Sequence, residues 1–190
     1  SLIRTAITHG TAVATEVAQR AERNDSPPAA EVLDLVIVGA GPAGLACALE
    51  AKRRGLRAVI LEQERLGGTV SKYPRRKLVM TQPVELPLHG KLDKTTYTKE
   101  ELLELWERIA SEQRLEILTE SCFTGLDRSP DGHFLVYSSR GTLPARNVCI
   151  AVGRRGTPRK LGVRGEDAPK VAYSLLDAQS YTSRRILVVG

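Results

Sequence analysis

The sequence contains few cysteines and few aromatic residues, and it lacks long apolar runs. Its three cysteines are an odd number with no C-x-x-C pair, so the chain alone builds neither a disulfide framework nor a zinc or iron–sulfur site. Aromatic residues make up 4% of the chain, which leaves few side chains for stacking against nucleic-acid bases. No apolar run has the length of a membrane span, and the N-terminus lacks a secretory signal. We therefore expect a cytoplasmic protein that has no metal site and binds neither nucleic acid nor membrane.

What the chain does contain is enough apolar sequence for a packed core. Hydrophobic residues make up 42% and charged residues 26% of its 190 residues, which is typical of a globular protein. A chain of this length holds one full domain and the edge of a second. The formal net charge of +6 suits an anionic ligand.

The N-terminal segment has helical periodicity. Small and aliphatic residues recur at three- and four-residue steps between Ile3 and Ala21, the spacing of one face of an amphipathic helix. The Pro-Pro pair at 27–28 then ends the helix, because proline lacks an N–H group and disfavours helix before it. We predict an N-terminal helix at residues 1–23 and a linker at residues 24–33.

The next segment carries a glycine fingerprint between a predicted strand and a predicted helix. Residues 34–38 are an apolar, β-branched run that leads directly into Gly39-Ala40-Gly41-Pro42-Ala43-Gly44. In this G-x-G-x-x-G pattern Gly39 allows a tight turn, Gly41 lets the backbone approach a pyrophosphate, and Gly44 allows the helix to pack closely on the strand. The free N–H groups and positive dipole end of the helix bind the phosphates. The fingerprint therefore predicts a dinucleotide site.

A carboxylate lies at the expected distance from the fingerprint. Residues 57–62 form the second predicted strand, which ends in Glu62, eighteen residues beyond Gly44. An acidic side chain about twenty residues from the glycines accepts hydrogen bonds from the ribose hydroxyls of an adenosine, and it disfavours a 2′-phosphate. The first site is therefore predicted to take FAD or NAD rather than NADP.

A second glycine pair, Gly67-Gly68-Thr69, follows the carboxylate within a few residues. With the fingerprint, it makes residues 33–190 resemble the two-dinucleotide-binding-domain flavoproteins, the pyridine nucleotide-disulfide oxidoreductase superfamily. The resemblance is closer to the thioredoxin-reductase-like and bacillithiol-disulfide-reductase-like branch. It implies an α/β fold, in which residues 34–160 form a Rossmann-like FAD-binding domain with a parallel sheet, crossover helices and a small β-meander.

Further patterns fit this fold. The capping box Thr98-Lys99-Glu100-Glu101 opens a predicted helix that runs to Glu112, and a third parallel strand follows at residues 115–118. The meander is predicted from three short strands at residues 123–127, 133–139 and 142–150.

The C-terminal segment predicts the start of a second unit. The aliphatic run at residues 186–189, after two arginines, is typical of a buried parallel strand. We therefore expect residues 161–190 to be a connector and the first strand of a truncated NAD(P)-binding domain, the alternative being an edge strand of the first domain.

The resemblance implies a set of cofactor-binding residues, mostly backbone contacts along the predicted strand ends and glycine loops. This set is Gly39, Gly41, Pro42, Ala43, Gly44, Glu62, Gln63, Gly67, Gly68, Thr69, Met80, Thr81, Cys122, Phe123, Ala151 and Gly153. Met80 or Tyr73 would cover one face of the flavin ring, and the alternative for Met80 is an ordinary core position. No catalytic side chain is assigned.

The cysteine pair of the glutathione-reductase relatives is missing, because Val70 and Arg75 stand at its positions. Thioredoxin reductases carry their C-x-x-C in the nicotinamide domain, so a disulfide and a ferredoxin both stay open as acceptors. Lys72, Arg76 and Lys77 surround Arg75 in a basic loop. This loop is either simply solvated or docks an acidic ferredoxin-like partner in a salt-sensitive manner.

The resemblance implies the FAD-binding portion of an NAD(P)H-dependent oxidoreductase. A nicotinamide nucleotide, held by a domain missing from this chain, would pass hydride to FAD and on to a redox acceptor. The fragment alone is expected to be inactive, and the full-length parent to be a homo-oligomer. Two other classes stay open: a dehydrogenase with one NAD site and no flavin, and a non-catalytic flavin- or NAD-binding module for sensing or assembly.

Overall fold

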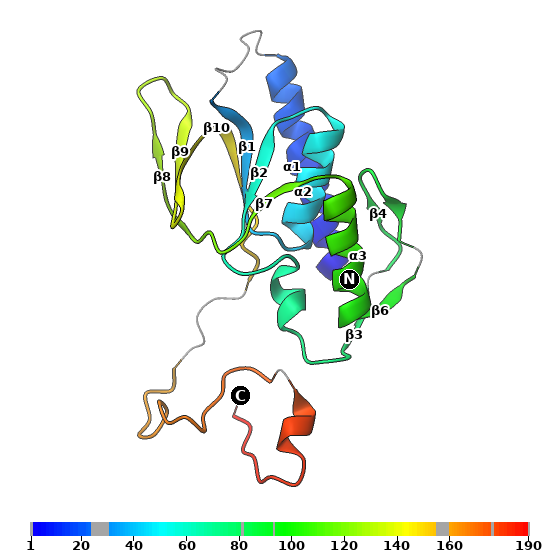
Figure 1. The fold of residues 1–190 in the computed structure, drawn as a ribbon, viewed down its shortest axis with the longest axis vertical. Helices are drawn as coiled ribbons and strands as arrows, with labels where there is room; N and C mark the ends of the chain where they lie inside the picture. Colours follow the sequence, from blue (N-terminus) through cyan, green and yellow to red (C-terminus); the bar gives the residue numbers. More distant parts are fainter. Residues whose placement is uncertain are drawn as a thin grey trace.

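The core of the fold is a six-stranded sheet in the order β7-β2-β1-β10-β9-β8 (Figure 1). The computed structural model describes residues 2–23, 31–80, 82–92, 94–154, 160–175 and 177–189. The strands of the sheet are β1 (Leu33–Val38), β2 (Ala58–Leu61), β7 (Glu116–Leu118), β8 (Phe123–Arg128), β9 (Phe134–Ser138) and β10 (Gly141–Ile150). Strands β7, β2 and β1 are parallel, as predicted for a Rossmann-like unit.

Strand β10 joins the parallel sheet to the predicted meander. Its first half pairs antiparallel with β9, and its second half pairs parallel with β1. Ala145 is the crossing point, because it is in register with Phe134 on one side and with Leu33 on the other. The three predicted meander strands are confirmed, but they continue the main sheet rather than form a separate one.

Helices connect the parallel strands in the expected way. Helix α2 (Pro42–Arg53) links β1 to β2, and α3 (Lys99–Glu112) lies in the longer connection from β2 to β7. The predicted capping box of α3 is present: Thr98 Oγ1 accepts the N–H of Glu101 at 3.2 Å, and the Glu101 carboxylate accepts the N–H of Thr98 at 2.7 Å.

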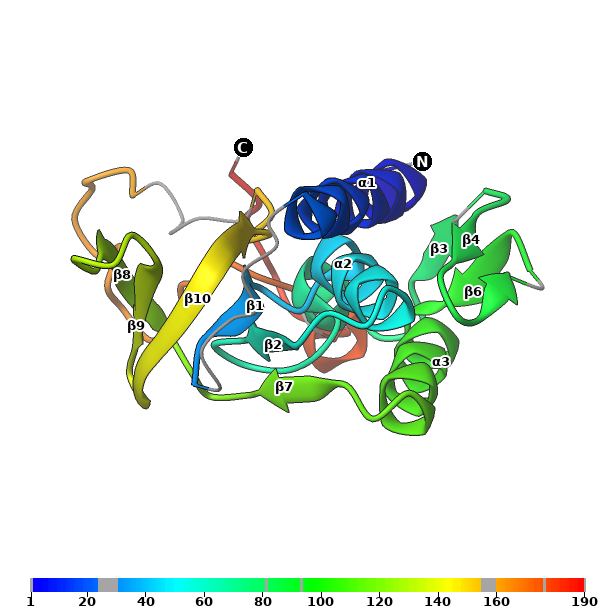
Figure 2. The ribbon, with the colours of Figure 1, turned by 90° about the horizontal axis from the view of Figure 1, so that it is seen from above.

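The predicted N-terminal helix is confirmed as α1 (Leu2–Glu22), which packs along the outer side of α2. Viewed from above, α2 lies between α1 and the sheet (Figure 2). Alternate residues of β1 are buried on opposite faces, because side chains of a strand alternate. Leu35 and Ile37 join the cluster that includes the helices, whereas Val36 joins a second cluster with Val136 of β9.

A buried carboxylate lies in the contact between α1 and α2. Glu50 has no exposed surface, and its side chain accepts hydrogen bonds from Arg53 (2.7 and 2.9 Å), Arg54 (2.6 Å) and Thr15 of α1 (3.2 Å). Burial by itself raises the pKa of Glu50, but these hydrogen bonds outweigh it and hold the pKa below the ordinary 4.5. The carboxylate is therefore charged at neutral pH and fixes the position of α1 along α2.

Several small elements complete the described fold: η1 (Gly68–Lys72), β3 (Leu78–Met80), β4 (Glu85–Leu86), β5 (Gly90–Lys91), β6 (Thr96–Thr98) and η2 (Ala178–Tyr181). Strand β3 pairs with β6, and β4 pairs with β5. Among the described helices, none combines the length and apolarity that crossing a bilayer requires.

The C-terminal aliphatic run differs from its prediction. Residues 184–189 lie outside the helices and strands, and Leu187 is 89% exposed. A parallel strand needs a neighbouring strand to pair its backbone groups, and none of the described strands pairs with this run. The predicted linker at 24–33 falls mostly on residues 24–30, which lie outside the described residues.

Candidate functional site

The predicted site residues gather where the parallel strands end. The N–H of Gly39 donates to the carbonyl of Leu61 at 2.7 Å, and the N–H of Ala151 donates to the carbonyl of Val38 at 2.8 Å. These bonds tie the segments that follow β1, β2 and β10 into one surface at the carboxyl edge of the sheet. Ligands of open α/β sheets bind at this edge.

Two fingerprint glycines allow a very tight turn between β1 and α2. Gly39 has φ of +105°, and a Cβ atom there would lie 2.5 Å from the carbonyl oxygen of Ala151. A Cβ atom on Gly44 would lie 1.9 Å from the carbonyl oxygen of Gly39. Neither position has room for a side chain, so the helix begins directly against the end of the strand.

The third fingerprint glycine faces open space. Gly41 is the N-cap of α2, with an ordinary extended backbone (φ −75°, ψ −175°), and a Cβ atom there would meet nothing within 4 Å. No side chain caps the helix, and Pro42 stands at its start. The first N–H groups of α2 therefore lie next to a space that an anionic ligand can enter.

Glu62 connects this turn to the end of β2. The side chain is 7% exposed, and its two oxygens accept the N–H groups of Ala40 at 2.8 Å and Glu64 at 2.9 Å. The N–H of Ser121 donates to the Glu62 carbonyl at 2.9 Å, which brings the segment after β7 to the same place. Each carboxylate oxygen accepts more than one hydrogen bond, so Glu62 retains capacity for ligand hydroxyls.

The second glycine pair lies against the first. The N–H of Gly67 donates to the carbonyl of Ala40 at 2.9 Å, and a Cβ atom on Gly68 would lie 3.1 Å from the Cα atom of Gly41. Both glycines have positive φ, +108° and +52°. The structure thus places Gly67 and Gly68 beside the fingerprint, and Thr69 follows them in η1.

The remaining predicted residues are less closely tied to the turn. Gln63 and Gly153 are exposed at the same edge, after β2 and β10 respectively. Cys122 is exposed, and its N–H donates to Ser139 Oγ at 3.0 Å, just before Phe123 begins β8. Met80 ends β3, but its side chain and Thr81 lie outside the described residues. Their contact with a flavin stays a prediction.

The three cysteines of the described residues are free thiols. Cys47 of α2 and Cys149 of β10 are both buried, whereas Cys122 is exposed and distant in sequence from both. A hydrogen bond with Cys149, together with burial, raises the pKa of Cys47, so this thiol stays protonated. Within the described ranges, no three His, Cys, Asp or Glu side chains are grouped as a metal site requires.

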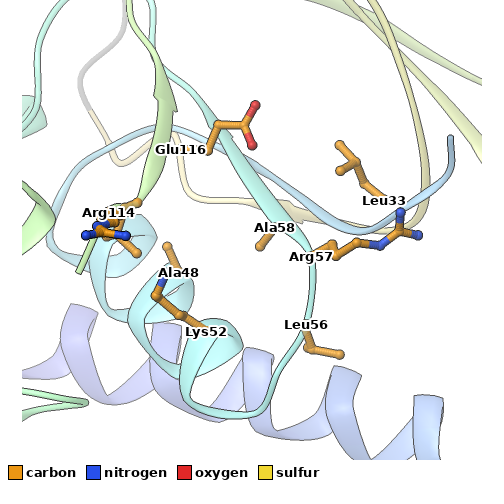
Figure 3. Close-up of a pocket in the computed structure, with 9 residues that line it drawn as sticks. Leu33, Ala48, Lys52, Leu56, Arg57, Ala58, Arg114 and Glu116 are labelled. Atoms are coloured by element: carbon orange, nitrogen blue, oxygen red, sulfur yellow. The ribbon is translucent and has the colours of Figure 1, made fainter. Parts of the chain in front are cut away.

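A hollow of about 290 Å³ lies at the opposite, amino edge of the sheet (Figure 3). Lys52, Arg57 and Arg114 line it together with Glu116 and apolar side chains. Lys52 lies in the last turn of α2 and Arg114 directly after α3, where cations stabilise the negative ends of the helix dipoles. Helix stabilisation accounts for Lys52 and Arg114, and Arg57 is held by the Val32 carbonyl and the Asp34 carboxylate, so we place the candidate site at the carboxyl edge.

Sequence reasoning missed how Glu62 is held. The pattern predicted a carboxylate for a ligand, but the structure shows that it also receives two backbone N–H groups. The Glu64 N–H is a local donor two residues away, whereas no local motif signals the Ala40 donor, because that contact depends on how the turn folds back over β2. Sequence reasoning also missed that Leu103 of α3 packs against Gly67. A Cβ atom on Gly67 would lie 2.3 Å from the Cδ2 atom of Leu103.

Comparison with known proteins is consistent with this arrangement. The family described as pyridine nucleotide-disulphide oxidoreductase matches residues 36–190. A ferredoxin–NADP reductase of Ignicoccus hospitalis is 30% identical over 157 residues, covering 83% of this chain and 48% of the relative. A thioredoxin reductase of Mycoplasma genitalium is 32% identical over 164 residues, covering 84% of this chain and 47% of the relative.

A solved structure shares the fold. The bacillithiol disulfide reductase Bdr from Staphylococcus aureus superposes with a TM-score of 0.69 at 21% sequence identity, covering 77% of this chain and 46% of that chain. The chain thus spans about half the length of the curated relatives that it matches.

Gly44 and Gly41 should respond differently to replacement by serine. We expect Gly44→Ser to lower the free energy of unfolding by about 1–3 kcal/mol, because the new Cβ overlaps the Gly39 carbonyl. Gly41→Ser should change it by less than about 0.5 kcal/mol, because serine is a favoured N-cap residue with free space there. Urea denaturation of both variants measures the difference, and equal losses would contradict this geometry.

Proposed function

The chain belongs to the pyridine nucleotide-disulphide oxidoreductase family, and from this we propose that it forms the FAD-binding portion of an NAD(P)H-dependent flavoprotein oxidoreductase. The observation that carries the proposal is the open space in front of Gly41, next to the carboxylate of Glu62. A dinucleotide needs both features at adjacent strand ends, one for its diphosphate and one for its ribose.

The residues present fit an adenine dinucleotide. The first N–H groups of α2 would hold the diphosphate, since they lack side-chain caps and point out of the helix. Glu62 would accept the ribose hydroxyls while its backbone donors keep the carboxylate oriented. Gly67 and Gly68 would line the ligand without side chains, and the backbone at Ala151 would close the opposite side.

FAD, when bound, supplies the capacity to accept a hydride and pass electrons on. The residues of this chain bind it, orient it and set the charge around it. The nicotinamide nucleotide would be held mainly by a further domain. Residues 161–190 would be the connector to that domain and its first strand. The half-length match to the relatives supports this division.

The described residues favour an external redox protein as acceptor. Val70 is buried in η1, and Arg75 is exposed in the loop after it, so no thiol stands at either position. Arg75 and Arg76 line a surface hollow of about 420 Å³ with Thr98 and Glu100. Leu78, 65% exposed, adds an apolar side chain to this basic surface, a combination that suits an acidic partner.

Anaerobic titration of the full-length protein tests the proposed function. We expect an absorbance band at about 450 nm that is bleached by NADH or NADPH, because the flavin is reduced. A full-length protein that binds NAD and shows no flavin band would indicate a flavin-free dehydrogenase. A flavin band that neither nucleotide bleaches would indicate a sensing or assembly module.

The acceptor proposal predicts salt-sensitive electron transfer. We expect the rate with an acidic ferredoxin to fall as ionic strength rises, because exposed charges are screened. In the full-length protein, Arg75→Glu with Arg76→Glu should lower the second-order rate constant by about tenfold at low salt. Arg4→Glu with Arg23→Glu, at two exposed positions near the ends of the N-terminal helical segment, is the matched control. If the rate changes neither with ionic strength nor on substitution of Arg75 and Arg76, the proposal of an acidic acceptor protein is contradicted.

A further inference from the structure

Glycines surround the first turn of α2 on three sides. Gly44 lies against the Gly39 carbonyl, Gly68 lies against Gly41, and Gly10 of α1 lies against Ala43. The first two contacts fall inside the family match at residues 36–190, whereas α1 lies outside it. The contact from α1 therefore comes from outside the matched region, and it is made at the turn that would hold the diphosphate.

The contact between Gly10 and Ala43 is a backbone contact. A Cβ atom on Gly10 would lie 2.0 Å from the carbonyl oxygen of Ala43 and 2.8 Å from its carbonyl carbon. No side chain can occupy that space, so α1 packs on α2 at a distance that only glycine permits. Figure 2 shows α1 on the side of α2 that faces away from the sheet.

The atom that α1 touches belongs to a functional peptide group. The carbonyl of Ala43 and the N–H of Gly44 share one planar peptide unit, with the oxygen and hydrogen on opposite sides. A rotation of this plane that moves the carbonyl oxygen also turns the Gly44 N–H, one of the first N–H groups of α2. Contact on the oxygen side fixes the direction of a donor on the ligand side.

A second contact sets the position of α1 along α2. Thr15 lies five residues after Gly10, and its hydroxyl hydrogen is shared between the Thr11 carbonyl at 3.0 Å and the buried Glu50 carboxylate at 3.2 Å. Arg53 and Arg54, at the end of α2, donate to the same carboxylate. Gly10 sets the distance between the helices at the first turn, and Thr15 sets their register.

We propose that α1 is a positioning element of the dinucleotide site and that Gly10 is its positioning residue. The inference rests on the proposed function, because the oriented N–H groups matter only if a diphosphate binds there. It extends that function by assigning part of the cofactor affinity to a helix outside the shared family region.

Substitution at Gly10 in the full-length protein tests the inference. We expect Gly10→Val to raise the dissociation constant for FAD by about tenfold, because the displaced helix turns the first-turn donors. In the apo protein, amide exchange at residues 45–47, the first amides bonded within α2, should accelerate by about tenfold, with β9 unchanged. Ala12→Val is the matched control, since Ala12 is an exposed residue of the same helix.

Each outcome decides between the alternatives. Affinity and exchange within about twofold of the wild type in a folded Gly10→Val protein would overturn the inference. If that variant does not fold, Gly10→Ala and Thr15→Val take its place, and unchanged values in both would overturn it equally. If the wild-type full-length protein binds no FAD, the proposed function fails, and the exchange measurement alone still decides whether α1 holds the turn.

Discussion

The structure depends on close backbone approach around the first turn of α2. That turn has to lie against the end of β1, next to the loop after β2, and under α1, and each approach is possible only where a side chain is missing. The helix N-terminus is then left open in one direction, toward the solvent in front of Gly41. Dense packing on the other sides holds this turn in place, so that its first N–H groups are available for the anion site that we propose.

Charge is distributed to match the two edges of the sheet. At the carboxyl edge, Glu62 is buried beside the positive end of α2, and each of its carboxylate oxygens accepts a backbone N–H group. At the amino edge, Lys52 and Arg114 stand at the negative ends of the helices. The buried carboxylates Glu50 and Glu62 both accept hydrogen bonds that offset their burial. Arginines donate to Glu50, and backbone N–H groups donate to Glu62.

Local sequence signals predicted the elements and the site, whereas contacts between distant segments were beyond them. The fingerprint from Gly39 to Gly44 and the capping box at Thr98 are short patterns with a local mechanism, and both lie where expected. The periodicity of α1 predicted a helix but not that Gly10 meets Ala43, since that depends on packing. The dual pairing of β10 is likewise non-local, and the run ending at Val189 predicted a strand for which the described chain supplies no neighbour.

A crystal structure of the full-length protein with adenosine diphosphate tests the central claim most directly. The account predicts diphosphate oxygens at about 3 Å from the first N–H groups of α2, with the ribose hydroxyls on the Glu62 carboxylate. Density for the ligand in the hollow beside Lys52 and Arg114, or at any place away from Gly41, would contradict it.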